Sequence, residues 1–589
     1  MSDDRSRTGV LSTLRGLVPY MRRYRTPLVL GLGAMVLKDG LAAAMPLMIK
    51  KAVDSLVAGY RIEQLLWFIG ALLAISAAKG VFQYWMRVLV IGVSRDIEFD
   101  LRNALFARMV TLSQDFYARS RTGDMMARAT NDINSVRMLV GPGLLYSTET
   151  SLTFLLALVV MGSVDWPLTL VTLLPAPVVT VAVVFYGRRI QRRFEKIQAL
   201  FSDVTSRVQE NVSGVRVLRA YAQEESELQR FSELNRKYIH ENLRLVRTSG
   251  TFLPIMQALV GVSFLLVLWA GGYRVLSGKI TLGTFLMFNF YMGMLVWPMV
   301  AMGWVVNMVH RGTASAERLQ QILREQPSIA APPKPLSLPR PLRGEIEFRR
   351  VSVRYPAGGG LFDLSIRIPA GATVAIVGHT GSGKSTLVHL IPRLLDPQHG
   401  CVLVDGIDVR DLDPAELRRA IGLVPQETFL FSTTLAENIG FGVPDATEEK
   451  IRQAAGLAGL VSDIAGFPDG YQTVLGERGM TLSGGQKQRT AIARAILRDP
   501  GILILDDALS SVDTLTEESI LRGLGGIMRG RTTILISHRV STVRHADRVF
   551  VIDKGTLAEE GTHEELLLAG GFYADLHQKQ LLEEELETI

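Results

Sequence analysis

The chain has very little cysteine: Cys401 is the only one among 589 residues. A single cysteine excludes an intramolecular disulfide and any metal site built from paired cysteines. Because Cys401 stands in the apolar run Cys401–Val404, we expect a buried strand residue there rather than a reactive thiol. The first 25 residues also lack a short apolar stretch ending in a small-residue cleavage site. We therefore expect no removable signal peptide.

Proline and glycine are nearly absent from a long stretch of the first half. Between Gln191 and Arg247 there is no proline, and Gly214 is the only glycine. Apolar residues recur there at helical spacing, which predicts long helices joined by a turn near Gly214. We interpret the basic stretch 93–138 in the same way, with its turn near Gly123. The chain shows no long-period internal repeat.

The sequence does contain several long apolar stretches. Hydrophobic residues make up 48% of the chain and charged residues 21%, which suits an apolar half joined to a soluble half. Six apolar stretches are long enough to span a membrane. They lie near 26–49, 64–92, 140–164, 166–187, 252–274 and 281–306.

The net charge of +7 is compatible with nucleic-acid binding or with basic residues beside membrane spans. Arginines cluster before the first span, at Arg22, Arg23 and Arg25, and in the long gaps after the second and fourth spans. This distribution favours a lipid bilayer and no nucleic acid. By the positive-inside rule, the N-terminus and both long gaps are cytoplasmic.

A change in composition separates two halves of the chain. Six prolines between Gln326 and Arg343 predict an extended linker. From Gly344, strands rich in Val and Ile alternate with helical stretches, which predicts an α/β domain. The predicted organisation is a cytoplasmic segment over 1–25, a six-helix transmembrane domain over 26–325, a linker over 326–343 and an α/β domain over 344–589 that ends in a charged helix.

The second half carries a phosphate-binding loop. The stretch from Gly378 to Ser385 meets the pattern G-x-x-x-x-G-K-[ST] in full, after the strand Thr373–Val377 and before a helix. Glycines let backbone N–H groups surround phosphate oxygens, and the helix N-terminus adds positive partial charge. Lys384 can bridge the outer phosphates, and the Ser385 hydroxyl can bind Mg²⁺.

An acidic strand end completes the pattern. The apolar run Ile502–Leu505 is followed by Asp506 and Asp507. A phosphate-loop enzyme holds Mg²⁺ with an aspartate in this position, so Asp506 takes that role. The predicted ligands are ATP and Mg²⁺. The predicted fold class is a polytopic α-helical membrane domain followed by an α/β phosphate-loop nucleotide-binding domain.

The sequence from Leu482 to Gln486 resembles the signature motif of ABC ATPases. With the order of domains, the chain resembles ABC exporters of the half-transporter type, as in lipid flippases and multidrug exporters. The nucleotide-domain resemblance covers about 344–577, and it implies that Tyr355 stacks on adenine. It also implies that Gln426 links the Mg²⁺ site to the membrane domain and that His538 is the switch histidine.

Further roles follow from the same resemblance. Ser510–Asp513 would cross a dimer interface, and Glu477 would lie in a loop facing the coupling helices. The resemblance places those coupling helices at two turns, one around Phe116, Tyr117, Gly123 and Arg128, the other around Glu210 and Gly214–Ala220. The predicted nucleotide contacts are Tyr355, Gly378, Thr380, Gly381, Ser382, Gly383, Lys384, Ser385, Thr386, Gln426, Ser483, Gly484, Gly485 and Gln486. The predicted Mg²⁺ ligands are Ser385, Gln426 and Asp506, and the predicted catalytic residues are Asp507, His538 and Gln426.

One position departs from the family pattern. The family places Glu as general base where this chain has Asp507, which is shorter by one methylene, and a misplacement of about 1 Å can slow catalysis on the order of 100-fold. The chain therefore resembles the degenerate-site subunit of heterodimeric bacterial multidrug exporters. Its intact signature would then complete a competent site on a different half-transporter carrying Glu. The alternative is a homodimer that uses Asp507 as a slower base.

The membrane half contains polar and adaptable side chains. Lys38, Asp39, Lys79, Arg87, Glu149, Gln257 and Asn289 lie in or near spans. Such residues face a cavity or a partner, and Lys38 and Asp39 could neutralise each other. The sixth span is rich in Met and aromatic residues, which suit either varied apolar ligands or helix packing.

Together these features predict ATP-driven export of a hydrophobic or amphipathic small molecule by one half of a dimeric transporter. A lipid flippase and an ATP-gated channel or regulatory subunit are alternatives. Uphill accumulation in vesicles separates a pump from a channel. We expect a multi-pass protein of the cell inner (plasma) membrane, with the nucleotide-binding domain and both termini in the cytoplasm.

Overall fold

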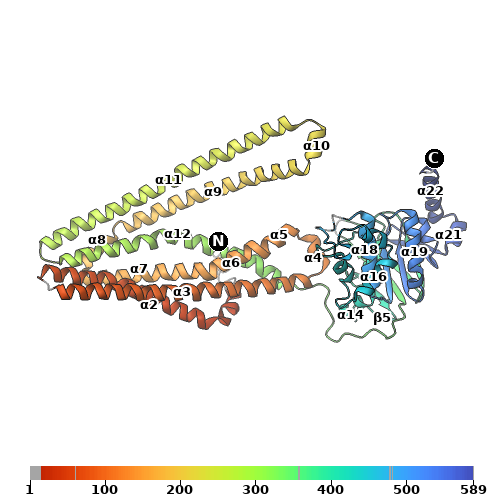
Figure 1. Cartoon of the computed structure of the whole chain (residues 1–589), viewed down its shortest axis with the longest axis horizontal. Helices are drawn as coiled ribbons and strands as arrows, with labels where there is room; N and C mark the ends of the chain where they lie inside the picture. Colours follow the sequence, from red (N-terminus) through yellow and green to blue (C-terminus); the bar gives the residue numbers. More distant parts are fainter. Residues whose placement is uncertain (1–14, 60–61, 356–357, 477–478, 480–481, 588–589) are drawn as a thin grey trace. The chain divides into compact units, whose positions relative to one another are not determined.

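The computed structural model describes residues 15–587, with gaps at 60–61, 356–357, 477–478 and 480–481 (Figure 1). Glu477 falls in one of these gaps, so its predicted role lies outside the described residues. The chain divides into two compact units. The first contains Met1–Val110 and Arg121–Glu325, and the second contains Thr111–Ser120 and Gln326–Ile589.

Six helices in the described part of the first unit are long and apolar enough to cross a membrane. They are α2 (Arg25–Val57), α3 (Ile62–Thr111), a third over Thr122–Val164, a fourth over Trp166–Ser213, α11 (Glu224–Leu276) and α12 (Leu282–Arg324). The third consists of α5 (Thr122–Ala127), α6 (Ile133–Met138) and α7 (Leu144–Val164), joined by two π-helical turns, and the fourth of α8 (Trp166–Leu173) and α9 (Ala176–Ser213). The prediction of six spans is confirmed.

Helix caps explain why the short connections turn the chain where the sequence predicts. The carboxylate of Asp165 accepts a hydrogen bond from the backbone N–H of Leu168 at 2.9 Å, which starts α8 directly after α7. Thr281 starts α12 in the same way, accepting from the N–H of Thr284 at 3.1 Å. Both caps satisfy an N–H group that the first turn of a helix leaves unpaired.

The helices run far beyond the predicted spans, as expected. Helices α9 and α11 lie side by side and are joined by the short helix α10 (Val215–Ala220), which begins directly after Gly214 (Figure 1). The first long gap turns earlier than predicted, at the short helix α4 (Gln114–Arg119). Gly123 lies instead inside α5, because the extended backbone of Arg121 starts that helix and the carboxylate of Asp124 falls in its positively polarised first turn.

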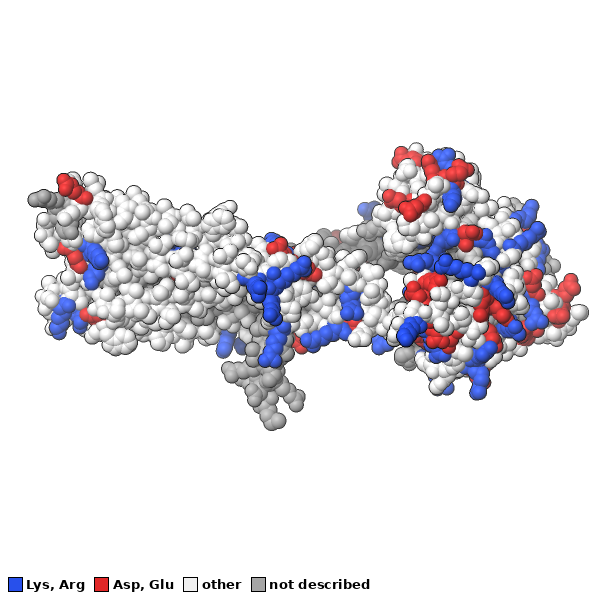
Figure 2. Space-filling model, turned by 90° about the horizontal axis from the view of Figure 1, so that it is seen from below, with Lys and Arg blue, Asp and Glu red and all other residues white. Residues whose placement is uncertain are grey.

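The interior of the first unit is built largely from α2, α7 and α12. Met287, Phe288 and Tyr291 of α12 are fully buried, and the Tyr291 hydroxyl donates to the carbonyl of Ala43 on α2. This half of the Met- and aromatic-rich span therefore packs against helices. Figure 2 shows one face of the unit, on which charged side chains gather toward the ends and leave a broad uncharged surface between them.

A charged cluster lies among these helices. The ammonium of Lys38 lies 2.7 Å from a carboxylate oxygen of Asp39, as the sequence suggested, and it also donates to Glu149 on α7. Lys38 and Asp39 are 5% and 3% exposed. The second carboxylate oxygen of Asp39 is buried without a hydrogen-bond partner among the described residues. The cluster links α2 to α7 through charge inside an apolar bundle.

The second unit contains two sheets. A four-stranded antiparallel sheet has the order β2-β1-β4-β5, and a six-stranded sheet has the order β10-β9-β3-β8-β7-β6. The strands are β1 (Ile346–Arg354), β2 (Gly360–Ile368), β3 (Thr373–Val377), β4 (His399–Val404), β5 (Ile407–Asp408), β6 (Ile421–Val424), β7 (Ile502–Asp506), β8 (Thr532–Ile536), β9 (Arg548–Asp553) and β10 (Thr556–Gly561). The fold class is therefore the predicted one. Cys401 lies in β4 as predicted, but it is half-buried rather than buried.

The six-stranded sheet positions the phosphate-binding loop and the acidic residues that follow β7. Strands β3, β7 and β8 are parallel, and every residue in them is buried, as expected for strands covered on both faces. Parallel strands present their carboxyl ends at one edge, so the loops after β3 and β7 meet. The α-helices that the structure describes in this unit after the linker are α13 (Lys384–Leu390), α14 (Pro414–Arg419), α15 (Leu435–Gly440), α16 (Glu448–Leu457), α17 (Val461–Ala465), α18 (Gly484–Leu497), α19 (Thr514–Met528), α20 (Val540–Val543), α21 (His563–Ala569) and α22 (Phe572–Glu587).

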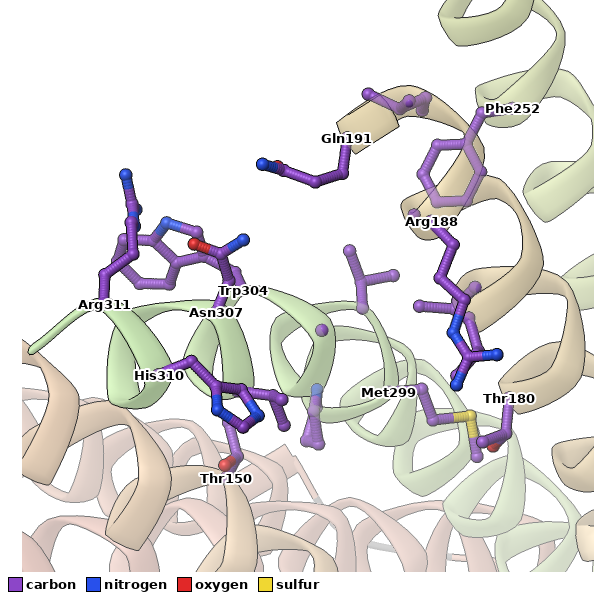
Figure 3. Close-up of a pocket in the computed structure, with 18 of the residues that line it drawn as sticks. Thr150, Thr180, Arg188, Gln191, Phe252, Met299, Trp304, Asn307, His310 and Arg311 are labelled. Atoms are coloured by element: carbon purple, nitrogen blue, oxygen red, sulfur yellow. The ribbon is translucent and has the colours of Figure 1, made fainter. Parts of the chain in front are cut away.

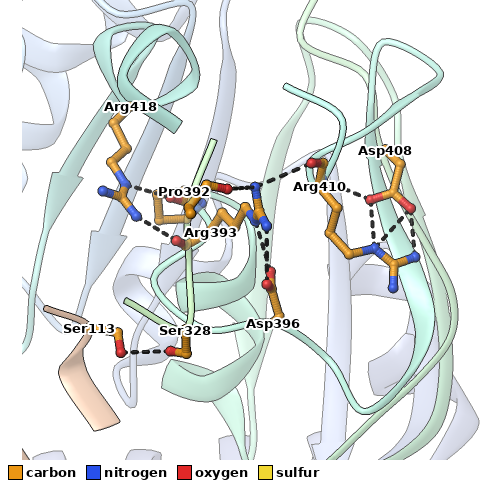
Figure 4. A network of polar contacts seen from close by, with 9 residues as sticks. Ser113, Ser328, Pro392, Arg393, Asp396, Asp408, Arg410 and Arg418 are labelled. Atoms are coloured by element: carbon orange, nitrogen blue, oxygen red, sulfur yellow. Dashed lines mark hydrogen bonds and ion pairs between the residues drawn. The ribbon is translucent and has the colours of Figure 1, made fainter. Parts of the chain in front are cut away.

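The segment with α4 belongs to this second unit. Ser113, just before α4, is hydrogen-bonded to Ser328 with a distance of 2.6 Å between their hydroxyl oxygens (Figure 4). Nearby, the buried guanidinium of Arg393 donates to the carboxylate of Asp396 at 3.0 Å and to the carbonyl of Ala330 at 3.2 Å. These contacts connect the start of the linker to the body of the second unit.

Candidate nucleotide-binding site

The phosphate-binding loop between β3 and α13 depends on glycine. Gly378, Gly381 and Gly383 have φ angles of +152°, +82° and +105°, which side chains disfavour. A Cβ atom at Gly378 would lie 2.1 Å from the carbonyl oxygen of Ile552, so no larger residue fits without moving the backbone. The loop therefore keeps its backbone close to β9.

Lys384 opens α13 and is held by the loop itself. Its ammonium donates to the carbonyl oxygens of Gly378 and His379, both at 2.8 Å. Burial lowers the pKa of Lys384, while the carboxylates of Asp506 and Asp507 act in the opposite direction. The ammonium is thus bonded to neutral carbonyls and positioned beside two acids.

Asp506 ends β7 next to this lysine. It is 1% exposed, and its carboxylate is hydrogen-bonded to the hydroxyl of Ser385. Burial raises the pKa of Asp506, and the charge of Asp507 adds to that effect. An adjacent cation would relieve both penalties, because it favours the ionised carboxylate.

Asp507 adopts a backbone conformation that few residues tolerate. Its φ is +49°, and its N–H donates to the carbonyl of Ile536 on β8 at 2.9 Å. Aspartate is among the residues that enter this left-handed region with the least strain. The carboxyl group is thereby directed to the edge of the sheet, where His538 also lies.

His538 follows β8 and lines the same pocket. Its pKa is lowered, first by burial and then by the charge of Lys384, although Asp507 and Asp506 oppose that shift. The neutral imidazole is therefore favoured near pH 7, with one ring nitrogen able to donate and the other to accept.

A pocket of about 300 Å³ brings most of the predicted residues together. Tyr355 lies at its rim with 43% of its surface exposed, and its hydroxyl is 3.2 Å from that of Thr386. The predicted residues that line the pocket are Tyr355, Thr380, Gly381, Gly383, Lys384, Ser385, Thr386, Gln426, Asp506, Asp507 and His538. Gly378 and Ser382 belong to the loop but do not line the pocket, and Ser382 is buried with its hydroxyl unpartnered among the described residues.

The signature residues Ser483, Gly484, Gly485 and Gln486 do not line this pocket. Ser483 caps α18, accepting from the N–H of Gln486 at 3.3 Å, and the Gln486 side chain accepts from the N–H of Ser483 at 2.9 Å. This reciprocal capping box fixes the start of the helix. Within one chain, the signature and the phosphate loop are thus parts of different surfaces.

Two features of the site were not assigned a role from sequence. Gly358, Gly359 and Gly360 line the pocket beside Tyr355, and their three-glycine run is a signal that could have been used. Gln488 on α18 is buried. Its amide donates to the Ser510 hydroxyl at 2.8 Å and accepts from the N–H of Ser511 at 2.9 Å. Gln488 therefore joins the signature helix to the loop that begins at Asp507, a contact that no local pattern reveals.

With this geometry in place, comparison with known proteins identifies matches over almost the whole chain. Residues 28–299 match the ABC transporter transmembrane region, and residues 361–510 match the ABC transporter family. The chain is 38% identical to the probable multidrug resistance ABC transporter ATP-binding/permease protein YheI of Bacillus subtilis, over 96% of both proteins. It is 36% identical to the ATP-dependent lipid A-core flippase of Syntrophus aciditrophicus, over 96% of this chain and 94% of that protein.

Two further relatives cover similar lengths. The multidrug resistance-like ATP-binding protein MdlA of Escherichia coli is 36% identical over 89% of both proteins. A solved structure of a bacterial Atm1-family ABC exporter with ATP bound superposes with a TM-score of 0.78 at 29% identity, covering 95% of this chain and 98% of that one. The likeness therefore includes both units and their order.

Proposed function

Because this chain belongs to the ABC transporter family, we propose that it is one half of an exporter that uses ATP to move hydrophobic or amphipathic compounds across the inner (plasma) membrane. The family couples ATP hydrolysis to transport, and this chain carries both the membrane-spanning helices and the ATP-binding unit. The names of its relatives, multidrug exporters and lipid A flippases, support an amphipathic substrate. They equally keep lipid flipping as a second candidate.

The observation that carries this proposal is the separation of the phosphate loop from the signature. The pocket around Lys384 is open, and Ser483 lies elsewhere on the same chain. A second nucleotide-binding unit would supply the missing side of each site, so ATP would be held between two units. ATP binding would then draw the two units together and hydrolysis would release them.

The donor set near the phosphate loop fits Mg²⁺. Ser385 and Asp506 are joined at one edge of the pocket, and Gln426 lines it, so hydroxyl, carboxylate and amide oxygens are available together. Mg²⁺ prefers oxygen ligands and keeps several waters beside substrate phosphates. A bound Mg²⁺ would neutralise phosphate charge and offset the burial of Asp506.

We assign catalysis to the residues at the far edge of that pocket. Asp507 would accept the proton of the attacking water, His538 would contact the terminal phosphate, and Gln426 would position the water and the metal. Because Asp507 is shorter than Glu, this pocket would be the slower of two. The chain would then pair with a different half-transporter carrying Glu, and its Ser483–Gln486 signature would complete the faster site. A homodimer that uses Asp507 is the alternative.

Two short helices are suited to transmit motion between units. Helix α4 carries Phe116 and Tyr117 and groups with the nucleotide-binding unit of its own chain. Apolar side chains are exposed on helix α10 and at its end, with Val217 62% exposed and Tyr221, directly after the helix, 74% exposed. Such side chains at the end of a long helical pair suit docking on a second nucleotide-binding unit. We propose both as coupling helices, in the cytoplasm together with both termini.

Reconstitution tests the proposal directly. Purified transporter in sealed vesicles, with nucleotide-binding units facing outward, should accumulate a fluorescent amphiphile against its gradient when ATP and Mg²⁺ are added. The Lys384→Ala variant should not. Dissipation of a preformed gradient without uphill accumulation would contradict export and favour a channel. Movement of a labelled lipid between leaflets, with no accumulation of a free amphiphile, would favour the flippase.

A further inference from the structure

The membrane unit contains a large cleft with two kinds of lining. Its volume is about 1200 Å³, and it lies among α7, α9, α11 and α12 (Figure 3). Phe154, Val183, Phe252 and Met299 supply an apolar side. The volume exceeds the range of roughly 300–1000 Å³ common for drug-sized ligands, so the cleft has room for a long-chain amphiphile.

The other part of the lining is cationic. Arg188 and Arg192 on α9 and Arg311 on α12 line the cleft, and Figure 3 shows the labelled Arg188 and Arg311 on opposite sides of it. The lining has one carboxylate, Glu195, which already accepts a hydrogen bond from Gln191 at 3.0 Å. In the part of the chain that the structure describes, none of the three arginines has an ion-pair or hydrogen-bond partner.

Neighbouring arginines on the same helix behave differently. Arg193 lies 3.7 Å from the carboxylate of Glu241, and Arg189 lies over the ring of Phe185 at 5.8 Å. Arg188 and Arg192 are four residues apart and so share a helix face. The usual excess of basic residues beside membrane spans explains the number of arginines in this region. It does not explain why the three arginines without a partner among the described residues line the cleft while Arg189 and Arg193 have partners.

We infer that the cleft binds amphiphiles whose head group is an oxyanion, such as a phosphate, sulfate or carboxylate, with the chain lying against the apolar side. Guanidinium groups bind oxyanions through paired N–H donors and stay charged at any physiological pH. A cationic head group would instead meet three positive charges. This inference rests on the proposed export function, and it adds the charge class of the substrate.

The test compares head groups on one chain. The transporter, assembled with its partner if it has one, is reconstituted in neutral phosphatidylcholine vesicles. It is exposed to dodecyl phosphate, dodecyl glucoside and dodecyltrimethylammonium, each with a photoreactive group in the chain. Cross-linking to peptides of α9 and α12 and stimulation of ATP hydrolysis give apparent affinities. Arg188→Gln, Arg192→Gln and Arg311→Gln are matched by the controls Arg189→Gln and Arg193→Gln.

We expect dodecyl phosphate to bind most tightly, and each cleft variant to weaken it by about 3- to 10-fold while leaving dodecyl glucoside unchanged. Arg188→Lys should retain most of the affinity. The control variants should bind all three probes as the unmodified protein does. Competition by phosphatidylglycerol in the vesicles would identify a lipid head group as the anion, and its absence would identify a free amphiphile.

Equal binding of the three head groups would overturn the inference, as would a loss that affects all three alike in the cleft variants. Absence of cross-linking with every probe would mean that another part of the assembly fills the cleft, and would also overturn it. Export is tested separately: uphill transport of only the neutral or cationic probe leaves the export proposal intact. Tight binding of dodecyl phosphate without ATP-driven accumulation of any of the three probes contradicts export and leaves the anion site.

Discussion

Buried charge is arranged differently in the two units of the chain. In the nucleotide-binding unit, Lys384 donates to main-chain carbonyls and the carboxylate of Asp506 accepts from the Ser385 hydroxyl, and both residues line an open pocket. In the membrane unit, Lys38 contacts two carboxylates directly and is closed off from solvent. A charged group that is bonded only to neutral groups beside a pocket can be balanced by a ligand of opposite charge. Charged groups that neutralise each other stabilise the fold instead.

The largest expected effect is that of substituting Lys384 in the nucleotide pocket. Lys384→Ala removes the cation expected to contact the outer phosphates, so ATP binding in this pocket should weaken strongly, and hydrolysis there, measured on the chain alone, should fall by at least about 1000-fold. Thermal unfolding without nucleotide should change little. Nucleotide binding and steady-state ATPase assays on the full chain test this, with exposed Lys450→Ala as the control. Unchanged ATP affinity would show that Lys384 does not contact phosphate.

Substitutions in the membrane cluster of Lys38, Asp39 and Glu149 should change stability, whereas the substitution of Lys384 should change ATP binding and hydrolysis. Lys38→Met leaves Asp39 and Glu149 without their cation, and unfolding should become easier by about 3 kcal/mol. The triple variant Lys38→Met, Asp39→Asn, Glu149→Gln should recover much of that loss, because no unpaired charge is left. Thermal unfolding in detergent measures both. A triple variant no more stable than the single one would mean that the cluster has a function beyond holding α2 to α7.

A smaller effect is expected at Asp507 if this pocket is the slower of two. Asp507→Asn should lower ATP hydrolysis of the assembled transporter by less than about 10-fold, whereas loss of a working general base lowers rates by about 100- to 10,000-fold. The chain alone should hydrolyse ATP slowly, and Asp507→Glu should raise the rate. A fast homodimer that Asp507→Asn inactivates would make Asp507 the working base and remove the heterodimer.

The smallest effect concerns the rim of the pocket. Tyr355→Ala should weaken ATP binding by about 3- to 10-fold, while Tyr355→Trp should bind nearly as well as the unmodified chain, because stacking needs an aromatic face rather than the hydroxyl. Tyr355→Phe separates the ring from the contact with Thr386. Fluorescent nucleotide titration measures all three. Equal affinities for the Ala and Trp variants would exclude an adenine contact.

Patterns close in sequence predicted much of this molecule. Six apolar runs became six helices, and the strand before Gly378 and the strand ending at Asp506 lie in one parallel sheet. These features depend on residues within one element. The pairing of Lys38 with Glu149 and the contact of Gln488 with Ser511 depend instead on how helices are rotated against distant segments, which local spacing does not determine. The catalytic and metal roles stay predictions.

The surroundings of the membrane residues also depend on distant helices. The Met- and aromatic-rich character of α12 was compatible with packing or with ligand binding, and its residues divide between packed positions and positions that line the cleft. Phe288 and Tyr291 are buried against other helices, while Met299 and Trp304 line the cleft. Side chains of the same kinds therefore have different surroundings along one helix, and only the positions of the neighbouring helices distinguish them. For the same reason, the sequence around Arg188 and Arg189 does not predict that Arg188 lines the cleft while Arg189 lies over the ring of Phe185.

The grouping of α4 with the nucleotide-binding unit has a consequence for tethering. The chain passes between its two units three times, after Val110, after Ser120 and after Glu325. A domain attached by one flexible linker samples a volume set by the length of that linker. Only the third passage joins the two units covalently through the body of the nucleotide-binding unit; the first two enclose the ten residues from Thr111 to Ser120, which belong to that unit through non-covalent contacts such as that of Ser113 with Ser328. A protease cut in the proline-rich linker would therefore leave this ten-residue segment as the one part of the nucleotide-binding unit still on the same peptide chain as the membrane helices.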